Sequence, residues 1–302
     1  MIANPVLKRL GFSDSDRVVI IHADDIGMCQ SSIEAFHILN QSGLVLSGAV
    51  MVPCPWFLEA VNLSKKLNSA DIGVHLTLTS EWESYRWRPI TTCDPKSGMI
   101  DDLGYFFKDA AVVQEKADPV FVRKEMVRQI GLAIQTGLAA THVDTHMGTV
   151  AHPKFMFDYV NLSLKHGLPA MIFRFDENGW IQAGLDRSTA KSAAELVNGL
   201  EYQNIPLLDH LRSMPLDNPD KRLERAKEIL GDLPAGITHF IIHPSIDTPE
   251  LRAITPDWAC RVADFELFRQ DEIALFMKEK GIKLIRYQAI KDLLPTPTPN
   301  FS

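Results

Sequence analysis

Two adjacent carboxylates, Asp24 and Asp25, stand at the end of an apolar segment that reads IIHADDIG over residues 20–27. An apolar run of this kind predicts a buried strand, and catalytic groups commonly lie where such a strand ends. Either aspartate alone could cap the following helix and complement its dipole. Two consecutive carboxylates exceed what a cap requires, so the pair indicates a functional site.

Other polar side chains also end or follow predicted strands: His75, His142, Asp144, His146, Arg174, Asp209, His210 and His243. In a parallel α/β fold the carboxyl ends of the strands form one rim, so we expect these groups to converge on one site. Carboxylates and imidazoles without a thiolate suit Zn²⁺, Mn²⁺, Fe²⁺, Co²⁺, Ni²⁺ or Mg²⁺. The set of residue types does not choose among these metals.

Each histidine also has a structural interpretation. A lone buried histidine such as His75 is more often a hydrogen-bonded core residue than a ligand. His142 and His146 are four residues apart in THVDTH, but the β-branched neighbours favour a strand and turn, so only one of them need face a metal. We favour His146, beyond the strand. The remaining histidines are left unassigned (His22, His152, His210) or read as structural (His37, His166, His239).

The elements that would position these groups alternate between strand and helix. RVVIIH at 17–22 is followed by a helix signal that ends at Gly43, and a later helix opens at Asp118 with Pro119 and ends at Gly137. Further strands are expected at LVLSGAVMV, DIGVHLTL, AATHVD, PAMIFRF, IPLLD, THFIIHP and KLIRY, and further helices at 219–230 and 263–280. About eight strands with helical connections predict an α/β fold, a closed or nearly closed barrel of parallel strands.

We read residues 1–302 as a single domain with two irregular segments. A long loop is expected at 80–116, and a loosely ordered tail at 293–302, where Pro, Thr and Asn dominate. The loop carries Trp82, Tyr85, Arg86, Trp87 and Arg88. Aromatic faces and arginines suit a sugar substrate, although the same residues could pack the loop onto the barrel or form a subunit interface.

Composition narrows the class of protein. The 302 residues are 46% hydrophobic and carry a formal charge of -7 without a long single-sign run, so neither a nucleic acid nor a membrane surface is an expected partner. The N-terminus lacks the apolar stretch of a signal peptide, and no apolar window is long enough to span a membrane. The four cysteines form no paired motif. We therefore expect a cytoplasmic protein, with a homo-oligomer left open.

Taken in order, ADDIG, GVHLTLT, THVDTH and the HP after an apolar strand resemble the YdjC-like carbohydrate deacetylases, relatives of the polysaccharide deacetylase superfamily. The resemblance covers roughly residues 17–290. It implies a distorted (β/α) barrel with one divalent metal ion, Mg²⁺ or Zn²⁺ foremost, held by Asp25, His75 and His146. It also implies that Asp24 is the general base, that His243 lies on the general-acid side, and that Arg174 orients a carboxylate.

The activity implied by the resemblance is removal of acetyl groups from small N-acetylated sugars. Asp24 would take a proton from the attacking water, and His243 would protonate the departing amine. Where the family continues its third motif with further histidines, this chain has Met147 and Gly148. Two alternatives therefore stay open: a metal-dependent hydrolase of another amide or ester, and a catalytically silent protein that binds a sugar or a metal.

Overall fold

The computed structural model describes residues 3–67 and 70–295. Its strands within these residues are β1 (Arg17–Ile26), β2 (Leu46–Val50), β3 (Ile72–Leu76), β4 (Val143–Thr145), β5 (His210–Ser213), β6 (Gly236–Ile242) and β7 (Lys283–Leu284). Its helices are α1 (Pro5–Arg9), α2 (Gln30–Gln41), α3 (Phe57–Lys66), α4 (Ala110–Lys116), α5 (Pro119–Gln135), α6 (Pro153–Lys165), α7 (Glu177–Gln182), α8 (Arg187–Tyr202), α9 (Arg222–Gly231), α10 (Pro249–Ile254), α11 (Trp258–Phe268), α12 (Asp271–Glu279) and α13 (Tyr287–Lys291), with two 3₁₀ turns, η1 (Pro95–Ser97) and η2 (His146–Ala151).

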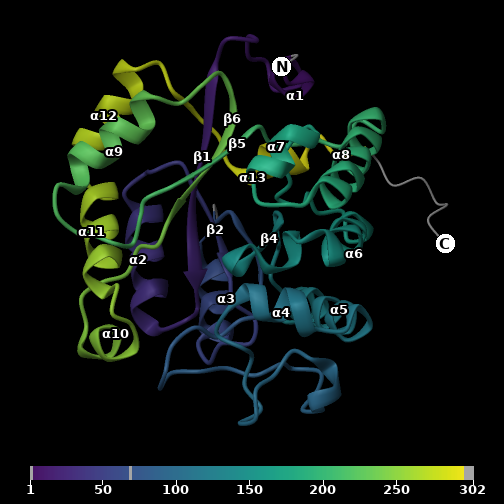
Figure 1. Cartoon of the computed structure of the whole chain (residues 1–302). Helices are drawn as coiled ribbons and strands as arrows, with labels where there is room; N and C mark the ends of the chain where they lie inside the picture. Colours follow the sequence, from purple (N-terminus) through teal and green to yellow (C-terminus); the bar gives the residue numbers. More distant parts are fainter. Residues whose placement is uncertain (1–2, 68–69, 296–302) are drawn as a thin grey trace.

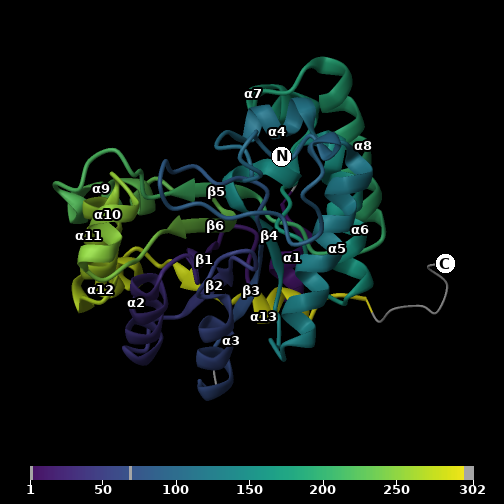
Figure 2. The same cartoon turned by 90° about the horizontal axis from the view of Figure 1, so that it is seen from below.

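The strands form one parallel sheet in the order β4-β3-β2-β1-β6-β5, and β7 pairs with β1. Two isolated parallel bridges, Val143 to Ala170 and Phe173 to Leu208, connect β4 with the segment that leads into β5. Figure 2 shows the curved sheet with helices packed around its outer face. The predicted parallel α/β barrel is therefore confirmed as a distorted half-barrel. The expected strand PAMIFRF forms only these bridges.

The helices cover the outer face of the sheet, with α9 to α12 on one side and α5, α6 and α8 on the other (Figure 1). Asp118 caps α5 by accepting a hydrogen bond from the Val120 amide, as the sequence predicted. The expected helix at 263–280 is wrong in extent, because two separate helices, α11 and α12, occupy this stretch of the chain. Asp271 and Glu272 occupy the first turn of α12, where acidic residues favour a helix N-terminus.

Side chains on the two faces of β1 pack into two different hydrophobic clusters. Val19, Ile21 and Ala23 belong to the main cluster between the sheet and the helices. Val18 and Ile20 belong to a smaller cluster inside the barrel with side chains that include Phe173, Leu208 and Tyr287. This alternation follows from the two-residue period of a strand. It places His22 and Asp24, which continue the series from Ile20, on the interior side.

A segment with little regular structure, residues 77–109, lies beyond the carboxyl ends of the strands (Figure 1). The predicted loop at 80–116 is therefore too long at its end, because residues 110–116 form α4 with Asp109 as its N-cap. Trp87, Met99 and Phe106 are buried, so the segment has its own apolar contacts. Most of the tail predicted at 293–302 lies outside the described residues.

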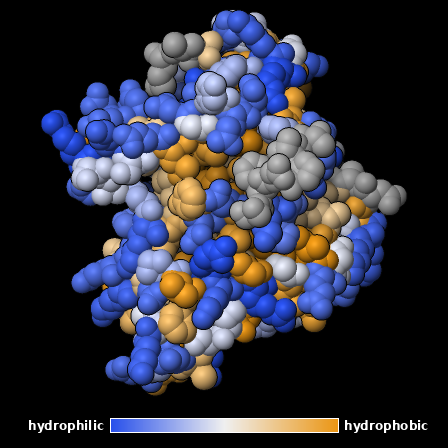
Figure 3. Space-filling model, turned by 90° about the vertical axis from the view of Figure 1, so that its right-hand side faces the viewer, coloured by the Kyte–Doolittle hydropathy of each residue, from blue (hydrophilic) through white to orange (hydrophobic). Residues whose placement is uncertain are grey.

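On the side of the molecule that carries α5, α6 and α8, apolar residues reach the surface between stretches of hydrophilic ones (Figure 3). Phe157 of α6 and Tyr202 of α8 are exposed. No helix within residues 3–67 and 70–295 is both long enough and apolar enough to span a membrane.

Candidate metal centre

Asp25, His75 and His146 meet at the carboxyl ends of β1, β3 and β4, where each offers a ligand atom within 4.8 Å of the others. The Oδ1 atom of Asp25 lies 3.5 Å from His75 Nε2 and 3.1 Å from His146 Nδ1. Ligands about 2.1 Å from a tetrahedral metal ion would be separated from each other by about 3.4 Å. The structure therefore brings together the three residues for which the resemblance implied metal binding, at separations that fit one ion.

An irregularity in β1 turns both aspartates toward this rim. Neighbouring residues of a regular strand point to opposite faces, but the register with β2 shifts between Ala23 and Ile26. Asp25 adopts a left-handed backbone with φ 62°, a conformation that is uncommon outside glycine and recurs at functional sites. Gly48 of β2 makes room for this bend, because a Cβ atom there would lie 2.5 Å from Ile26 Cδ1.

Two of the three ligand atoms have no protein hydrogen-bond partner. Asp25 Oδ1 and His75 Nε2 are both buried and unpaired. Leaving such atoms without a partner costs roughly 1–3 kcal/mol each. A cation between them would satisfy both at once, so the residues present fit a bound metal ion.

The opposite atoms of the same three residues are held by charged side chains. His75 Nδ1 lies 2.9 Å from Asp144, His146 Nε2 lies 3.0 Å from Glu81, and Arg261 donates to Asp25 Oδ2 at 2.7 Å. Carboxylates behind histidines orient metal ligands and fix their tautomers in known metal sites. Neither Glu81 nor Arg261 was identified from the sequence, since neither lies at a strand end or in a recognisable motif.

The electrostatics of the site favour positive charge. Burial lowers the pKa of His75, but Asp144 and Asp24 raise it well above its usual range. Burial likewise lowers the pKa of His146, but Glu81 and Asp25 raise it to about 9. The negative charges of these carboxylates outnumber the one positive charge that Arg261 brings to the site. A divalent cation would compensate the excess negative charge while leaving both imidazoles neutral.

Asp24 lies beside the triad, and His243 is near enough to Asp24 to lower its pKa. Asp24 Oδ1 accepts a hydrogen bond from His22 Nδ1 at 2.6 Å, and Asp24 Oδ2 lies 3.8 Å from His75 Nε2. Burial raises the pKa of Asp24, but His75 and then His22 outweigh it and hold the pKa below its usual range. The His243 amide donates to Asp264, while the His243 Nδ1 atom is buried without a hydrogen-bond partner.

The segment that follows β3 forms a wall of the site. Trp87 lies edge-on to His146 with ring centroids 6.2 Å apart, and the guanidinium of Arg261 lies 5.5 Å from the Trp82 ring. Trp82 and Trp87 are both buried, and Trp87 Nε1 donates to the Thr79 carbonyl. These two tryptophans therefore pack the segment against the metal centre.

The other members of the predicted sugar-binding cluster are also engaged within the protein. Arg86 pairs with Asp101 at 2.6 Å, Tyr85 donates to the Met28 carbonyl, and Arg88 lies over the Tyr105 ring. Arg88 is exposed. These contacts support the packing alternative for Arg86, and contact with a sugar stays a prediction for the cluster.

The structure does not place Arg174 within this network. Its guanidinium pairs with Glu201 of α8 at 2.6 Å and with Asp209 at 3.1 Å. Asp209 in turn accepts hydrogen bonds from Asn4 and from the Ile237 amide. These contacts tie α8 and the N-terminal segment to the sheet. A role for Arg174 in orienting a substrate carboxylate stays a prediction.

The departure in the third motif does not disturb the triad. β4 ends at Thr145, and Met147 and Gly148 both take left-handed conformations directly after His146. The Met147 side chain is 48% exposed. Met147 is therefore turned toward solvent at this point of the chain.

A second group of buried residues, His22, Asp24, Asp144 and His239, also has the composition of a metal site. His22, however, uses both ring nitrogens on protein partners, Asp24 at 2.6 Å and His142 at 2.7 Å. His239, which the sequence analysis interpreted as structural, is hydrogen-bonded to the Tyr287 hydroxyl. We interpret this group as a hydrogen-bonded network beneath Asp24.

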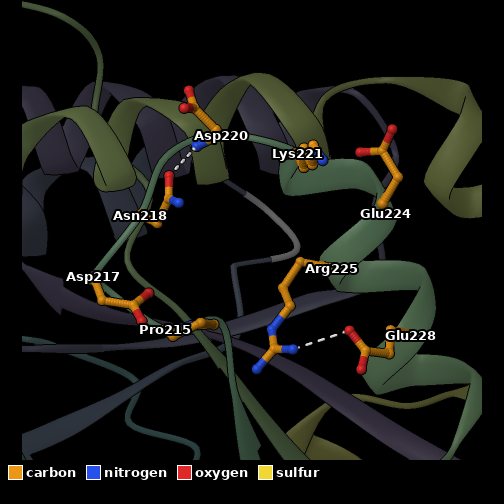
Figure 4. Close-up of a pocket in the computed structure, with 8 residues that line it drawn as sticks. All are labelled: Pro215, Asp217, Asn218, Asp220, Lys221, Glu224, Arg225 and Glu228. Carbon is orange, nitrogen blue, oxygen red and sulfur yellow. Dashed lines mark hydrogen bonds and ion pairs between the residues drawn. The ribbon is translucent and has the colours of Figure 1, made fainter.

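A surface pocket of about 340 Å³ lies elsewhere, between the segment after β5 and the start of α9. In Figure 4 Arg225 pairs with Glu228 at 2.9 Å, and Asn218 Oδ1 accepts a hydrogen bond from the Asp220 amide. It shares no lining residue with the triad. The pocket therefore does not contribute to the candidate metal centre.

Fold and site together define a class: an α/β half-barrel with a His-His-Asp triad at the carboxyl ends of its strands. The chain belongs to the YdjC-like protein family, whose model matches residues 18–280.

Relatives span nearly the whole chain. A carbohydrate deacetylase of Thermus thermophilus is 29% identical over 289 residues, covering 96% of this chain and 99% of its own. A carbohydrate deacetylase of Vibrio vulnificus is 29% identical over 277 residues, covering 90% of this chain and 96% of its own. The chain also resembles the crystal structure of an Enterococcus faecalis protein that is proposed to cleave cellobiose-phosphate. The two are 23% identical in sequence with a TM-score of 0.74, and the match covers 91% of this chain and 99% of that one. That likeness confirms the fold.

Proposed function

We propose that the protein is a metal-dependent hydrolase that removes acetyl groups from small N-acetylated sugars. The observation that carries this proposal is the triad of Asp25, His75 and His146, in which Asp25 Oδ1 and His75 Nε2 are buried without a hydrogen-bond partner. A protein that only binds a sugar needs no proton acceptor and donor beside a metal centre. The curated relatives, which match over nearly their full length and are named carbohydrate deacetylases, support the same activity.

The residues divide the reaction between them. Asp25, His75 and His146 would hold a divalent cation, which when bound polarises an acyl carbonyl and lowers the pKa of water. Asp24, an anionic carboxylate, accepts the proton of the water that attacks the amide carbon. His243 donates a proton to the nitrogen as the C–N bond breaks. The products are acetate and an amino sugar.

The side chains around the triad suit this division. Asp24 is ionised at neutral pH, as a carboxylate ordinarily is, and can therefore accept a proton. His243 has a ring nitrogen free of protein partners for a proton transfer.

The test is acetate release from N-acetylglucosamine mono- and oligosaccharides, with chelated protein restored by Zn²⁺, Mg²⁺, Mn²⁺, Co²⁺ or Ni²⁺. Metal-dependent release is expected from at least one substrate. The Asp24→Asn variant should keep its metal and lose at least about a hundredfold in turnover, because it removes the general base. Asp220→Asn, an exposed position away from the triad, is the matched control.

Two results would contradict the proposal. Full activity in Asp24→Asn would remove the base from the mechanism. A folded, metal-loaded protein that releases no acetate with any metal would favour another amide or ester substrate, or a silent site.

A further inference from the structure

A chain of buried polar residues runs from Asp24 into the barrel. His22 Nδ1 contacts Asp24 at 2.6 Å, and His22 Nε2 contacts His142 Nε2 at 2.7 Å. The other ring nitrogen of His142 lies 3.0 Å from the Thr141 hydroxyl, which donates to Asp71 at 2.7 Å. His22 and His142 are both fully buried. The assigned ligands and acid-base groups of the reaction do not include these two histidines.

The contacts fix which nitrogen of each ring carries a proton. An ionised carboxylate only accepts hydrogen bonds, so His22 must donate from Nδ1 to Asp24. Because the Thr141 hydroxyl gives its proton to Asp71, it accepts a hydrogen bond from His142 Nδ1. Burial lowers the pKa of His142 well below its usual range, so the ring is neutral and its Nε2 atom accepts from His22 Nε2. The chain therefore places a proton on Nδ1 of both histidines.

The His142 ring is clamped in the position that this arrangement requires. It stacks on Tyr287 with ring centroids 3.7 Å apart and an interplanar angle of 12°. Against the same ring lies Gly73, where a Cβ atom would come within 2.6 Å of His142 Nε2. No side chain larger than hydrogen fits at Gly73 without moving the histidine. Packing thus holds the Nε2 atom of His142 against His22.

We propose that His22, held in place by His142, is a positioning residue that orients Asp24 for proton transfer. His22 holds Oδ1 of Asp24, and this contact directs Oδ2 toward the triad, where it lies 3.8 Å from His75 Nε2. The consequence for catalysis rests on the proposed deacetylase function. The proton on His22 Nδ1 does not, since it follows from the hydrogen bonds alone.

The first experiment compares His22→Leu with His22→Asn. Leucine fills the space but cannot donate, whereas an asparagine amide nitrogen occupies a place similar to Nδ1 and can donate to Asp24. We expect His22→Leu to lower kcat by about a hundredfold with KM within threefold and metal content unchanged, as for a displaced catalytic group. His22→Asn should stay within tenfold of the wild type. Equal losses in both variants, or metal loss in His22→Leu, would overturn the proposal.

The second experiment needs no activity and covers a His22→Leu variant that does not fold. In protein labelled with ¹⁵N-histidine, ring ¹⁵N shifts identify each tautomer, and His22→Asn assigns the His22 signals. We expect a proton on Nδ1 of His22 in the wild type and its partial loss in Gly73→Ala, where His142 must move away from His22. Gly131→Ala, where a Cβ atom meets nothing within 4 Å, is the control and should leave it unchanged.

An Nε2–H tautomer at His22 in the wild type would overturn the proposal. So would an unchanged tautomer in a folded Gly73→Ala protein. If the wild type shows the Nδ1–H form but releases no acetate with any metal, the proposed function fails and the hydrogen-bonded arrangement stands.

Discussion

Replacing Glu81 with glutamine tests whether the segment after β3 helps to build the metal centre. Glu81 Oε2 lies 3.0 Å from His146 Nε2, and the other nitrogen of that ring faces Asp25 Oδ1 at 3.1 Å. A carboxylate behind a ligand imidazole orients the ring and strengthens it as a donor to the metal. Glutamine keeps the size of the side chain and removes its charge, so metal affinity should fall.

The expected loss of metal affinity depends on how exposed the replaced carboxylate is to water. Removing such a partner typically weakens metal binding by about 10- to 100-fold. The Glu81 side chain is 20% exposed, whereas Asp144, the partner of His75, is 1% exposed. Water can partly replace Glu81 but not Asp144. We therefore expect about tenfold weaker binding in Glu81→Gln, roughly 1.4 kcal/mol, and a larger loss in Asp144→Asn.

The assay is a competition titration of the chelated protein with Zn²⁺ against a chromophoric chelator, with circular dichroism to verify folding. Glu83→Gln is the matched control, because Glu83 is exposed and pairs with Lys108 rather than with the triad. Wild-type affinity in Glu81→Gln, or an equal loss in Glu83→Gln, would refute the reasoning and leave Glu81 as a packing contact only.

Two further predictions concern stability. Burial lowers the pKa of both His142 and His239 well below the usual range, so below about pH 6.5 the unfolded chain binds more protons than the folded one. In the chelated protein the free energy of unfolding should therefore fall as pH drops from 6.5 to 5, by about 1.4 kcal/mol per pH unit for each histidine. Urea titrations of His239→Asn should show that the free energy of unfolding depends less steeply on pH. An unchanged dependence on pH would count against a neutral His239. Trp87 is 3% exposed, so Trp87→Ala should lose about 3–5 kcal/mol of unfolding free energy in urea, and a loss below about 1 kcal/mol would contradict its packing role.

Much of the fold and part of the candidate site could be predicted from local patterns. Apolar runs alternating with capped helices predicted a parallel α/β barrel, because burial on both faces of a strand leaves a clear signature. The same patterns placed Asp25, His75 and His146 near the ends of strands. Strands that run in parallel carry such groups to one rim, so these three residues could be linked although 121 positions separate the first from the last.

The sequence alone determined which residue types were available, their placement along the strands, and the family resemblance. Only the tertiary structure decided which atoms meet. Glu81 reaches His146 across 65 positions and Arg261 reaches Asp25 across 236, and neither has a local pattern that marks it. The turn of Asp24 and Asp25 to one rim depends on the irregular pairing of β1 with β2. Side-chain contacts of this kind arise from the packing of distant segments, which residue periodicity does not encode.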